Sequence, residues 1–358
     1  RYLIEDEIIS KQEDIDYFRT TIKPYWQNKS LEDVLRKRYG SEIDAIAPVV
    51  KINQKDHAQG HICPNCTEWL KKGPAGLLQE ARQKRIECHA EKRDFYESVI
   101  LVMQGEQLFM QRYAKLLQSM AAASQNKQWQ ANMLQVAQNC QTLAERPPQT
   151  FHEAVQALWF LFVTLQMESN ASSFSPGRLD NYLWPFYERD IAAGLLTKQQ
   201  ALEILEALWL KFNEIVYMRN ANSAKFFAGF PIGFNIAIGG QDAAGMDFVN
   251  TLSFLCLKAQ EQIGLPQPNL SVRLHPGTKD ARLKQAIRVV AKGSGMPQFF
   301  NDKAVIPAMI ESLGIAENDA RDYAIVGCVE LTTQGNNLGW SDSAMFNLNQ
   351  VQELALNG

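Results

Sequence analysis

The sequence predicts an α/β protein in which long helices alternate with single short strands. Helical patterns cover most of 76–168, where apolar residues recur at intervals of three and four. Short apolar runs that stand alone, as at 235–238 and 324–326, are typical of buried strands. Because single strands separated by helices characterise α/β architecture, this is the fold class we expect.

Size, charge and cysteine content narrow the class of protein. The chain has 358 residues, of which 46% are hydrophobic and 21% charged, and its net charge is −3. This length allows one large or two medium domains. No basic excess indicates nucleic acid or an anionic membrane as a partner, and no apolar run approaches the ~18 residues that cross a bilayer. The six scattered cysteines indicate reduced thiols in a cytoplasmic protein.

The first 150 residues are expected to be mostly helical. Ser30 with Asp33 has the spacing of a capping box and predicts a helix to about Tyr39, and 45–50 is a plausible strand. Over 95–123 an amphipathic stripe predicts a helix whose apolar residues belong to the core rather than to a cofactor site. These residues are Val99, Val102, Met103, Leu108, Tyr113, Leu116, Leu117 and Met120.

A second capping box, Thr150 with Glu153, predicts a deeply buried helix to about 168. The polar run 168–182 follows it directly, and an aromatic stretch comes next. A polar segment between two core elements favours the lining of an internal cavity over a surface loop.

The remaining elements alternate in the same way. Expected are helices at 197–216, 248–257, 280–291, 315–322 and 351–356, and strands at 235–238, 267–273 and 324–326. The phenylalanines that end at Phe234 form either the apolar wall of a pocket or plain core. Gly239 and Gly240 lack the neighbours of a phosphate-binding loop.

Four potential metal ligands lie close together in the sequence, His57, His61, Cys63 and Cys66. Structural zinc sites pair two such clusters, and no second Cys-x-x-Cys occurs in the chain. An ordinary loop is therefore preferred to a zinc site, and we expect no bound metal or cofactor.

The stretch around Cys328 is the strongest candidate for chemistry. Gly327 lets the backbone turn after the strand at 324–326. If the chain stays extended beyond it, the Cys328 thiol and the Glu330 carboxylate point the same way. A cysteine is more often a small hydrophobe than a reagent, so the spacing alone does not decide its role.

The residues around Cys328 indicate its role. Gly327-Cys-Val-Glu330, with Gly339-Trp-Ser-Asp342 downstream, resembles the active-site loop of the glycyl radical enzymes, the pyruvate formate-lyase superfamily, and most of all its dehydratase and C–N or C–S lyase branch. The runs 168–182, 267–273 and 295–302 resemble the same family. Pyruvate formate-lyase itself has two adjacent cysteines where this chain has Cys328 and Val329.

The resemblance implies a ten-stranded barrel of two five-stranded halves. This chain would supply a helical part, 1–150, and the first half-barrel, 151–358. The family's radical glycine lies in an Arg-Val-x-Gly-Tyr/Phe motif that this sequence does not contain, so we expect a fragment that is inactive alone. The resemblance further implies a homodimer and an activating enzyme that uses S-adenosylmethionine.

The resemblance also implies site roles. Cys328 would abstract a hydrogen atom as a thiyl radical, and Glu330 would act as base. His61, Ser173 and Asp342 would contact the substrate, although loop capping explains Ser173 and Asp342 equally well. Phe234 is a further candidate contact, as part of the possible apolar wall named above and not through the resemblance. Ser172 stands where glycerol-type dehydratases have a histidine, which indicates a different substrate.

Two alternatives remain open at this stage. One is a divergent formate C-acetyltransferase-like activity. The other is a non-catalytic partner subunit of the same fold, against which the buried polar run 168–182 argues, because an idle cavity gains nothing from polar lining.

Overall fold

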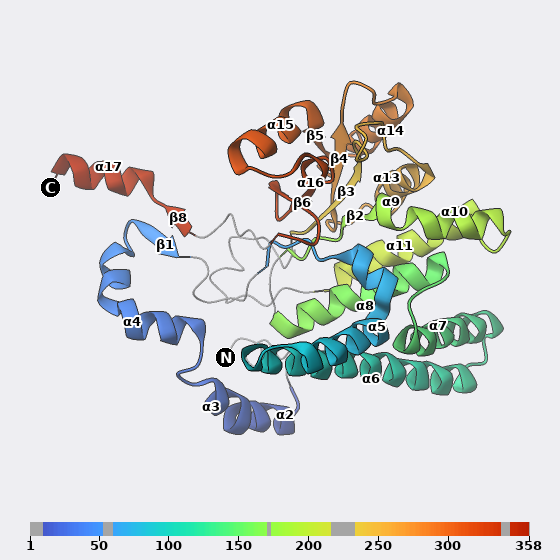
Figure 1. The fold of residues 1–358 in the computed structure, drawn as a ribbon, viewed down its shortest axis with the longest axis horizontal. Coiled ribbons are helices and arrows are strands. Elements are labelled where there is room, and N and C mark those ends of the chain that lie inside the picture. The colour runs from blue at the N-terminus through green and yellow to red at the C-terminus, as the bar shows by residue number, and fades with distance from the viewer. Residues whose placement is uncertain (1–9, 53–59, 170–172, 216–232, 338–343, 358) are drawn as a thin grey trace.

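The computed structural model describes residues 10–52, 60–169, 173–215, 233–337 and 344–357. Helices dominate its first part. They are α2 (Gln12–Tyr17), α3 (Lys23–Trp26), α4 (Leu31–Ile46), α5 (Cys66–Glu87), α6 (Arg93–Ala123), α7 (Lys127–Glu145) and α8 (Phe151–Ser169). Helices α5, α6 and α7 pack together as an outer layer at the bottom of Figure 1, with α8 next to them.

Both predicted capping boxes lie at helix starts. The Ser30 hydroxyl accepts the backbone N–H of Asp33, whose carboxylate accepts the N–H of Ser30, and this begins α4. At α8 the Thr150 hydroxyl accepts the N–H of Glu153, but the Glu153 carboxylate accepts the N–H of Gln149 instead of that of Thr150.

The predicted strand at 45–50 is wrong. Helix α4 continues to Ile46 through a kink at Tyr39, where φ is −135° and ψ is 26°. The strand in this region is β1 (Val50–Ile52), and it pairs antiparallel with β8 (Ala344–Phe346). Its partner lies almost 300 residues away, so the local pattern could not place it.

The predicted core stripe on α6 is only partly correct. The buried side of the helix carries Ile100, Glu106, Met110, Ala114 and Ala121. Five predicted core residues are instead exposed, namely Val102, Leu108, Tyr113, Leu116 and Met120. Because α6 lies in the outer layer, only one side of a broad apolar surface meets the rest of the described chain.

A four-stranded parallel sheet forms the centre of the second part, in the order β2 (Gly177–Arg178), β3 (Asn235–Gly239), β4 (Asn269–Leu274) and β5 (Gln298–Asn301). The helices that follow each strand are α9 (Leu179–Tyr182), α10 (Trp184–Ala192), α11 (Lys198–Glu214), α13 (Thr251–Ile263), α14 (Asp280–Val290) and α15 (Asp302–Leu313). Every residue of β3 is buried, as expected for a strand covered on both faces. The α/β prediction is confirmed.

After α15 the chain returns to the parallel sheet and packs a hairpin against it. After α16 (Glu317–Arg321), strand β6 (Ala324–Val326) packs on β2 and β3 and pairs antiparallel with β7 (Glu330–Thr332). Helix α17 (Leu348–Asn357) ends the described chain beside β8 (Figure 1).

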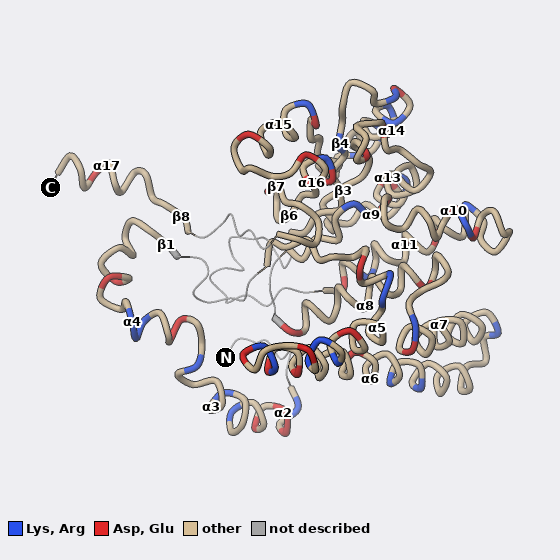
Figure 2. The backbone as a smooth tube through the Cα atoms, viewed as in Figure 1, with Lys and Arg blue, Asp and Glu red and all other residues tan. Residues whose placement is uncertain are grey.

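Charged residues of both signs are mixed along the helices, as Figure 2 shows for α5. There Lys72 pairs with Glu68 and Glu80, and Lys84 pairs with Glu80. No helix in the described part of the chain combines the length and the apolar composition that crossing a bilayer requires.

Candidate active site

Cys328 lies at the tip of the β6–β7 hairpin. Residues 327–329 form a turn, and Val326 pairs with Glu330 across it. The chain is therefore not extended from Cys328 to Glu330, and the turn, not the pleat of a strand, brings thiol and carboxylate to one end of the hairpin. The Cys328 side chain is exposed in this chain.

Gly327 is required at the start of the turn for two reasons. Its φ of +56° lies in the left-handed region, which side chains disfavour. A Cβ built on it would also lie only 2.4 Å from the Glu330 Oε2 and the His61 Cδ2. The backbone here approaches two candidate site residues so closely that a side chain on residue 327 would displace them.

Replacing Gly327 with Ala should therefore distort the site as well as strain the backbone. Gly314→Ala is the matched control, because Gly314 has a similar φ of +65° but open space where the Cβ would lie. We expect both variants to lose about 1–2 kcal/mol through backbone strain, and Gly327→Ala to lose more, measured from denaturant midpoints. Equal losses would contradict the close packing around Gly327.

His61 is a side-chain partner of Glu330. The His61 Nε2 and the Glu330 Oε1 are 3.4 Å apart, and the histidine is 9% exposed. His61 has a φ of +55°, an uncommon value for a residue with a side chain. Tertiary contacts hold this conformation, since the next residue, Ile62, bridges Phe174, and its carbonyl accepts the N–H of Ser175 at 2.9 Å.

The Glu330 carboxylate is held in its ionised form. Burial raises its pKa, but hydrogen bonds from His61 and from the backbone N–H of Val329 outweigh burial, so that the pKa lies below its ordinary value. A lowered carboxyl pKa stabilises the folded chain above the unfolded-state pKa, and this contribution is lost as the pH falls through the folded-state value. Glu330 thus stays available as a proton acceptor at neutral pH.

The other predicted substrate contacts have different surroundings. The Ser173 side chain is 2% exposed and its Oγ donates to the Gly233 carbonyl at 2.7 Å, which supports the loop-capping alternative. The Phe234 ring packs against Phe162 and Phe212, at 4.8 and 4.9 Å between centroids, which supports the core alternative. Asp342 and Ser172 lie outside the described residues, as do 339–341.

The polar run before α10 is buried over residues 173–180, whereas Glu168 is exposed. Ser175 and Asp180 are fully buried, and burial raises the pKa of the Asp180 carboxyl. Asp180 accepts the backbone N–H of Gly239 at 2.8 Å and a hydrogen bond from the Ser253 hydroxyl. Asp180 therefore joins α9 to β3 and α13. That the polar run lines an internal cavity stays a prediction.

Two buried arginines fix the start of β6, a role that the sequence did not reveal. Arg178, at the end of β2, donates to Asp322 at 2.6 Å and to the Gly239 carbonyl at 3.0 Å. Gln334 then joins both residues, accepting the Arg178 N–H and donating to the other oxygen of Asp322. The loop after β7 is thereby tied to the sheet.

Arg273 on β4 binds the same segment from the other side. It forms two 3.0 Å hydrogen bonds with Asp302 and donates to the Tyr323 carbonyl at 3.0 Å. The Tyr323 hydroxyl also donates to Asp302, and the guanidinium lies over the tyrosine ring, 3.8 Å from its centroid. The residue before β6 is therefore fixed to β4 and to the start of α15.

Cys63 and Cys66 are buried free thiols beside this site. Burial raises the pKa of Cys66 to about 12 and that of Cys63 well above its usual value. Thiols of this kind are protonated at neutral pH and poor metal ligands. Within the described ranges no group of three or more metal-binding side chains occurs.

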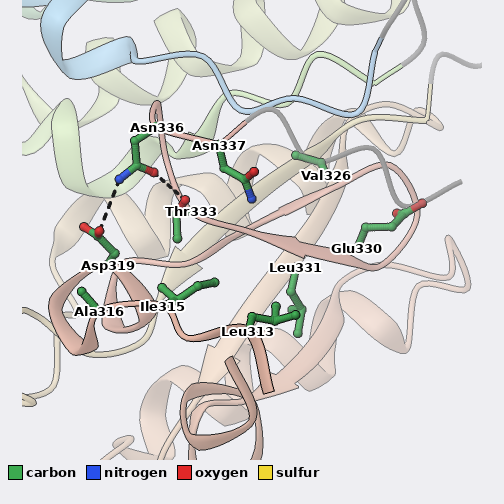
Figure 3. Close-up of a pocket in the computed structure, with 10 residues that line it drawn as sticks. All are labelled: Leu313, Ile315, Ala316, Asp319, Val326, Glu330, Leu331, Thr333, Asn336 and Asn337. Carbon is green, nitrogen blue, oxygen red and sulfur yellow. Dashed lines mark hydrogen bonds between the residues drawn. The ribbon is translucent and has the colours of Figure 1, made fainter. Parts of the chain in front are cut away.

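A cavity of about 550 Å³ adjoins the hairpin (Figure 3). At one end Asn336 bonds Thr333 and, at 3.3 Å, Asp319, while Glu330 lies at the other end. Cys328, His61 and Ser173 do not line it. Of the candidate site residues, Glu330 lines the cavity, and Val326 of β6 lies beside it in the lining.

The fold and the site together define a class of α/β proteins that carry a cysteine on a hairpin packed against a parallel sheet. A family model described as pyruvate formate lyase-like matches residues 4–358. This chain therefore belongs to the pyruvate formate lyase-like family, that of the glycyl radical enzymes.

Known relatives and solved structures are similar to this chain over most of its length. Probable dehydratase YbiW of Escherichia coli (strain K12) is 34% identical over 352 residues, which cover 94% of this chain and 43% of that protein. The (2S)-3-sulfopropanediol dehydratase of Klebsiella oxytoca is 31% identical, with 93% and 42% covered. The glycerol-bound B12-independent glycerol dehydratase from Clostridium butyricum superposes with a TM-score of 0.91 at 32% identity, covering 97% of this chain and 45% of that one. The chain spans less than half the length of these proteins.

Proposed function

We propose that this chain forms the cysteine-bearing half of a glycyl radical lyase that removes water or another leaving group from a small hydroxylated substrate. The observation that carries the proposal is the hairpin turn, which gathers Cys328, Glu330 and His61 at one place. Dehydratase and lyase names among the relatives support it. We keep the division at residue 150 into a helical part and a half-barrel, and a cytoplasmic homodimer, as parts of the same proposal.

The chemistry follows from the three side chains. A radical glycine outside this sequence, generated by an activating enzyme that uses S-adenosylmethionine, supplies the unpaired electron. The Cys328 sulfur, as a thiyl radical, takes a hydrogen atom from a carbon that bears a hydroxyl group. Glu330 takes the proton of that hydroxyl while the neighbouring C–X bond breaks, and His61 donates a hydrogen bond or proton to the departing group. Cys328 then returns its hydrogen atom, so that the products are a carbonyl compound and HX.

Glu330→Gln should separate base catalysis from structure. The amide keeps the shape of the side chain but cannot take a proton, so we expect turnover to fall by about 10²–10⁴-fold, with the radical content unchanged. Because the pKa of Glu330 lies below its ordinary value, protonation of its carboxylate should limit wild-type activity only at acidic pH. Full activity of Glu330→Gln would rule out this base.

The proposal itself is tested with the natural gene product, activated without oxygen. Release of a carbonyl product from a panel of small diols, amino alcohols and sulfonated alcohols would support it. The formate-forming alternative predicts formate from pyruvate and coenzyme A instead. A gene product of this length alone, with no radical signal after activation and no partner chain, would overturn it.

A further inference from the structure

We infer that Asn235 is the positioning residue that holds the Cys328 turn in place, an inference that rests on the proposed role of Cys328. Asn235 is the first residue of β3 and is fully buried. Its Nδ2 donates to the Gly327 carbonyl and, at 3.3 Å, to the Cys328 carbonyl. One side chain therefore binds two consecutive carbonyls of a three-residue turn.

This geometry fixes the direction of the catalytic side chain. Two consecutive carbonyls that face the same donor determine the orientation of the peptide planes on both sides of the Cys328 Cα. The direction of the Cα–Cβ bond follows from those planes, so only rotation about that bond remains for the thiol. The two arginines described above fix the start of β6, and Asn235 fixes its far end.

Asn235 is itself held by two serines. The Ser271 hydroxyl on β4 donates to its Oδ1 at 2.7 Å, and the Ser175 hydroxyl accepts its backbone N–H at 3.0 Å. The orientation of the amide follows from its partners, because carbonyl oxygens can only accept and the Nδ2 must therefore face the turn. Strands β3 and β4 and the segment before β2 thus contribute to one donor position.

Only an amide suits this position. Aspartate has the same shape but would place carboxylate oxygens against two carbonyl oxygens, and it could donate one hydrogen bond only when protonated. Leucine would leave two carbonyls without a buried donor. The chemistry of the contact therefore requires a donor toward the turn and an acceptor toward Ser271 in a single short side chain.

The test measures the turn directly and does not depend on turnover. A nitroxide label is attached to Cys328 in a Cys88→Ser background, since the other four cysteines are buried. We expect Asn235→Asp to shorten the rotational correlation time of the label severalfold at pH 8, with partial recovery at low pH as the carboxyl becomes protonated. Ser271→Ala should act in the same direction but less strongly.

The matched control is Asn139→Asp. Asn139 is also buried, at 2% exposure, but its amide bonds Gln135 and Gln156 in the helical layer. It should leave the label unchanged even where it lowers the unfolding midpoint. Unchanged mobility in Asn235→Asp, or equal changes in both variants, overturns the inference.

A second readout links the turn to catalysis in the activated enzyme. Asn235→Asp should lower kcat strongly while the substrate KM and the glycyl radical signal stay near their wild-type values. A mobile label with wild-type kcat overturns the positioning role. An inactive wild-type enzyme would instead count against the proposed function, and the label result would still decide whether Asn235 holds the turn.

Discussion

Cys328→Ser should abolish turnover while leaving the fold and the glycyl radical intact. A hydroxyl hydrogen is bound more strongly than a thiol hydrogen, so the radical glycine cannot take it and a serine cannot become the radical that attacks the substrate. Cys328 is exposed at the tip of the turn in this chain, and neither its side chain nor a serine in its place is part of the described core. Loss of activity would therefore report chemistry and not unfolding.

Cys88→Ser is the control for this experiment. Cys88 is the only other cysteine that is not fully buried, and it lies at the end of α5, outside the candidate site. The measurement pairs product formation with the radical signal by electron paramagnetic resonance. Turnover in Cys328→Ser above the background of the unactivated enzyme would remove the central claim of the proposed mechanism.

The largest effect on stability is expected for Asp302→Asn. Asp302 is 1% exposed and receives two hydrogen bonds from the fully buried Arg273 and one from the Tyr323 hydroxyl. The amide would leave the Arg273 charge uncompensated in the interior, a change that costs about 3–5 kcal/mol. The denaturant midpoint of this variant should fall accordingly, and β6 should lose its attachment to β4.

An exposed ion pair provides the comparison. Arg321 and Glu317 are 2.6 Å apart, but the glutamate side chain is 61% exposed. Water screens such a pair, so Glu317→Gln should change the unfolding free energy by about 0–1 kcal/mol. Similar losses in Glu317→Gln and Asp302→Asn would show that burial does not govern the strength of the Arg273–Asp302 contact.

The sequence predicted the local structure well where the signal was local. The capping residues Ser30 and Thr150 begin helices, because a cap and its partner lie within one turn. The apolar runs at 235–238 and 324–326 are strands, because full burial leaves a continuous hydrophobic run. Predictions that needed a distant partner, such as the strand at 45–50 and the core side of α6, were less reliable.

The candidate site likewise combines features that the sequence indicated with features that depend on distant contacts. Resemblance pointed to the family, which the comparisons confirm, and to Cys328, Glu330 and His61. It did not reveal that a hairpin, and not an extended strand, joins the first two residues. It also gave no role to Asn235, whose side chain binds a turn 92 residues further along the chain.

By itself, then, the sequence determined the α/β class, most helix and strand positions, and the turn at Gly327, since each depends on neighbouring residues. Only the tertiary structure decided that His61 lies 3.4 Å from Glu330 and that Asn235 faces the cysteine turn. Those contacts join residues from different strands and loops, and their positions follow from how the sheet pairs and packs, which no local pattern contains.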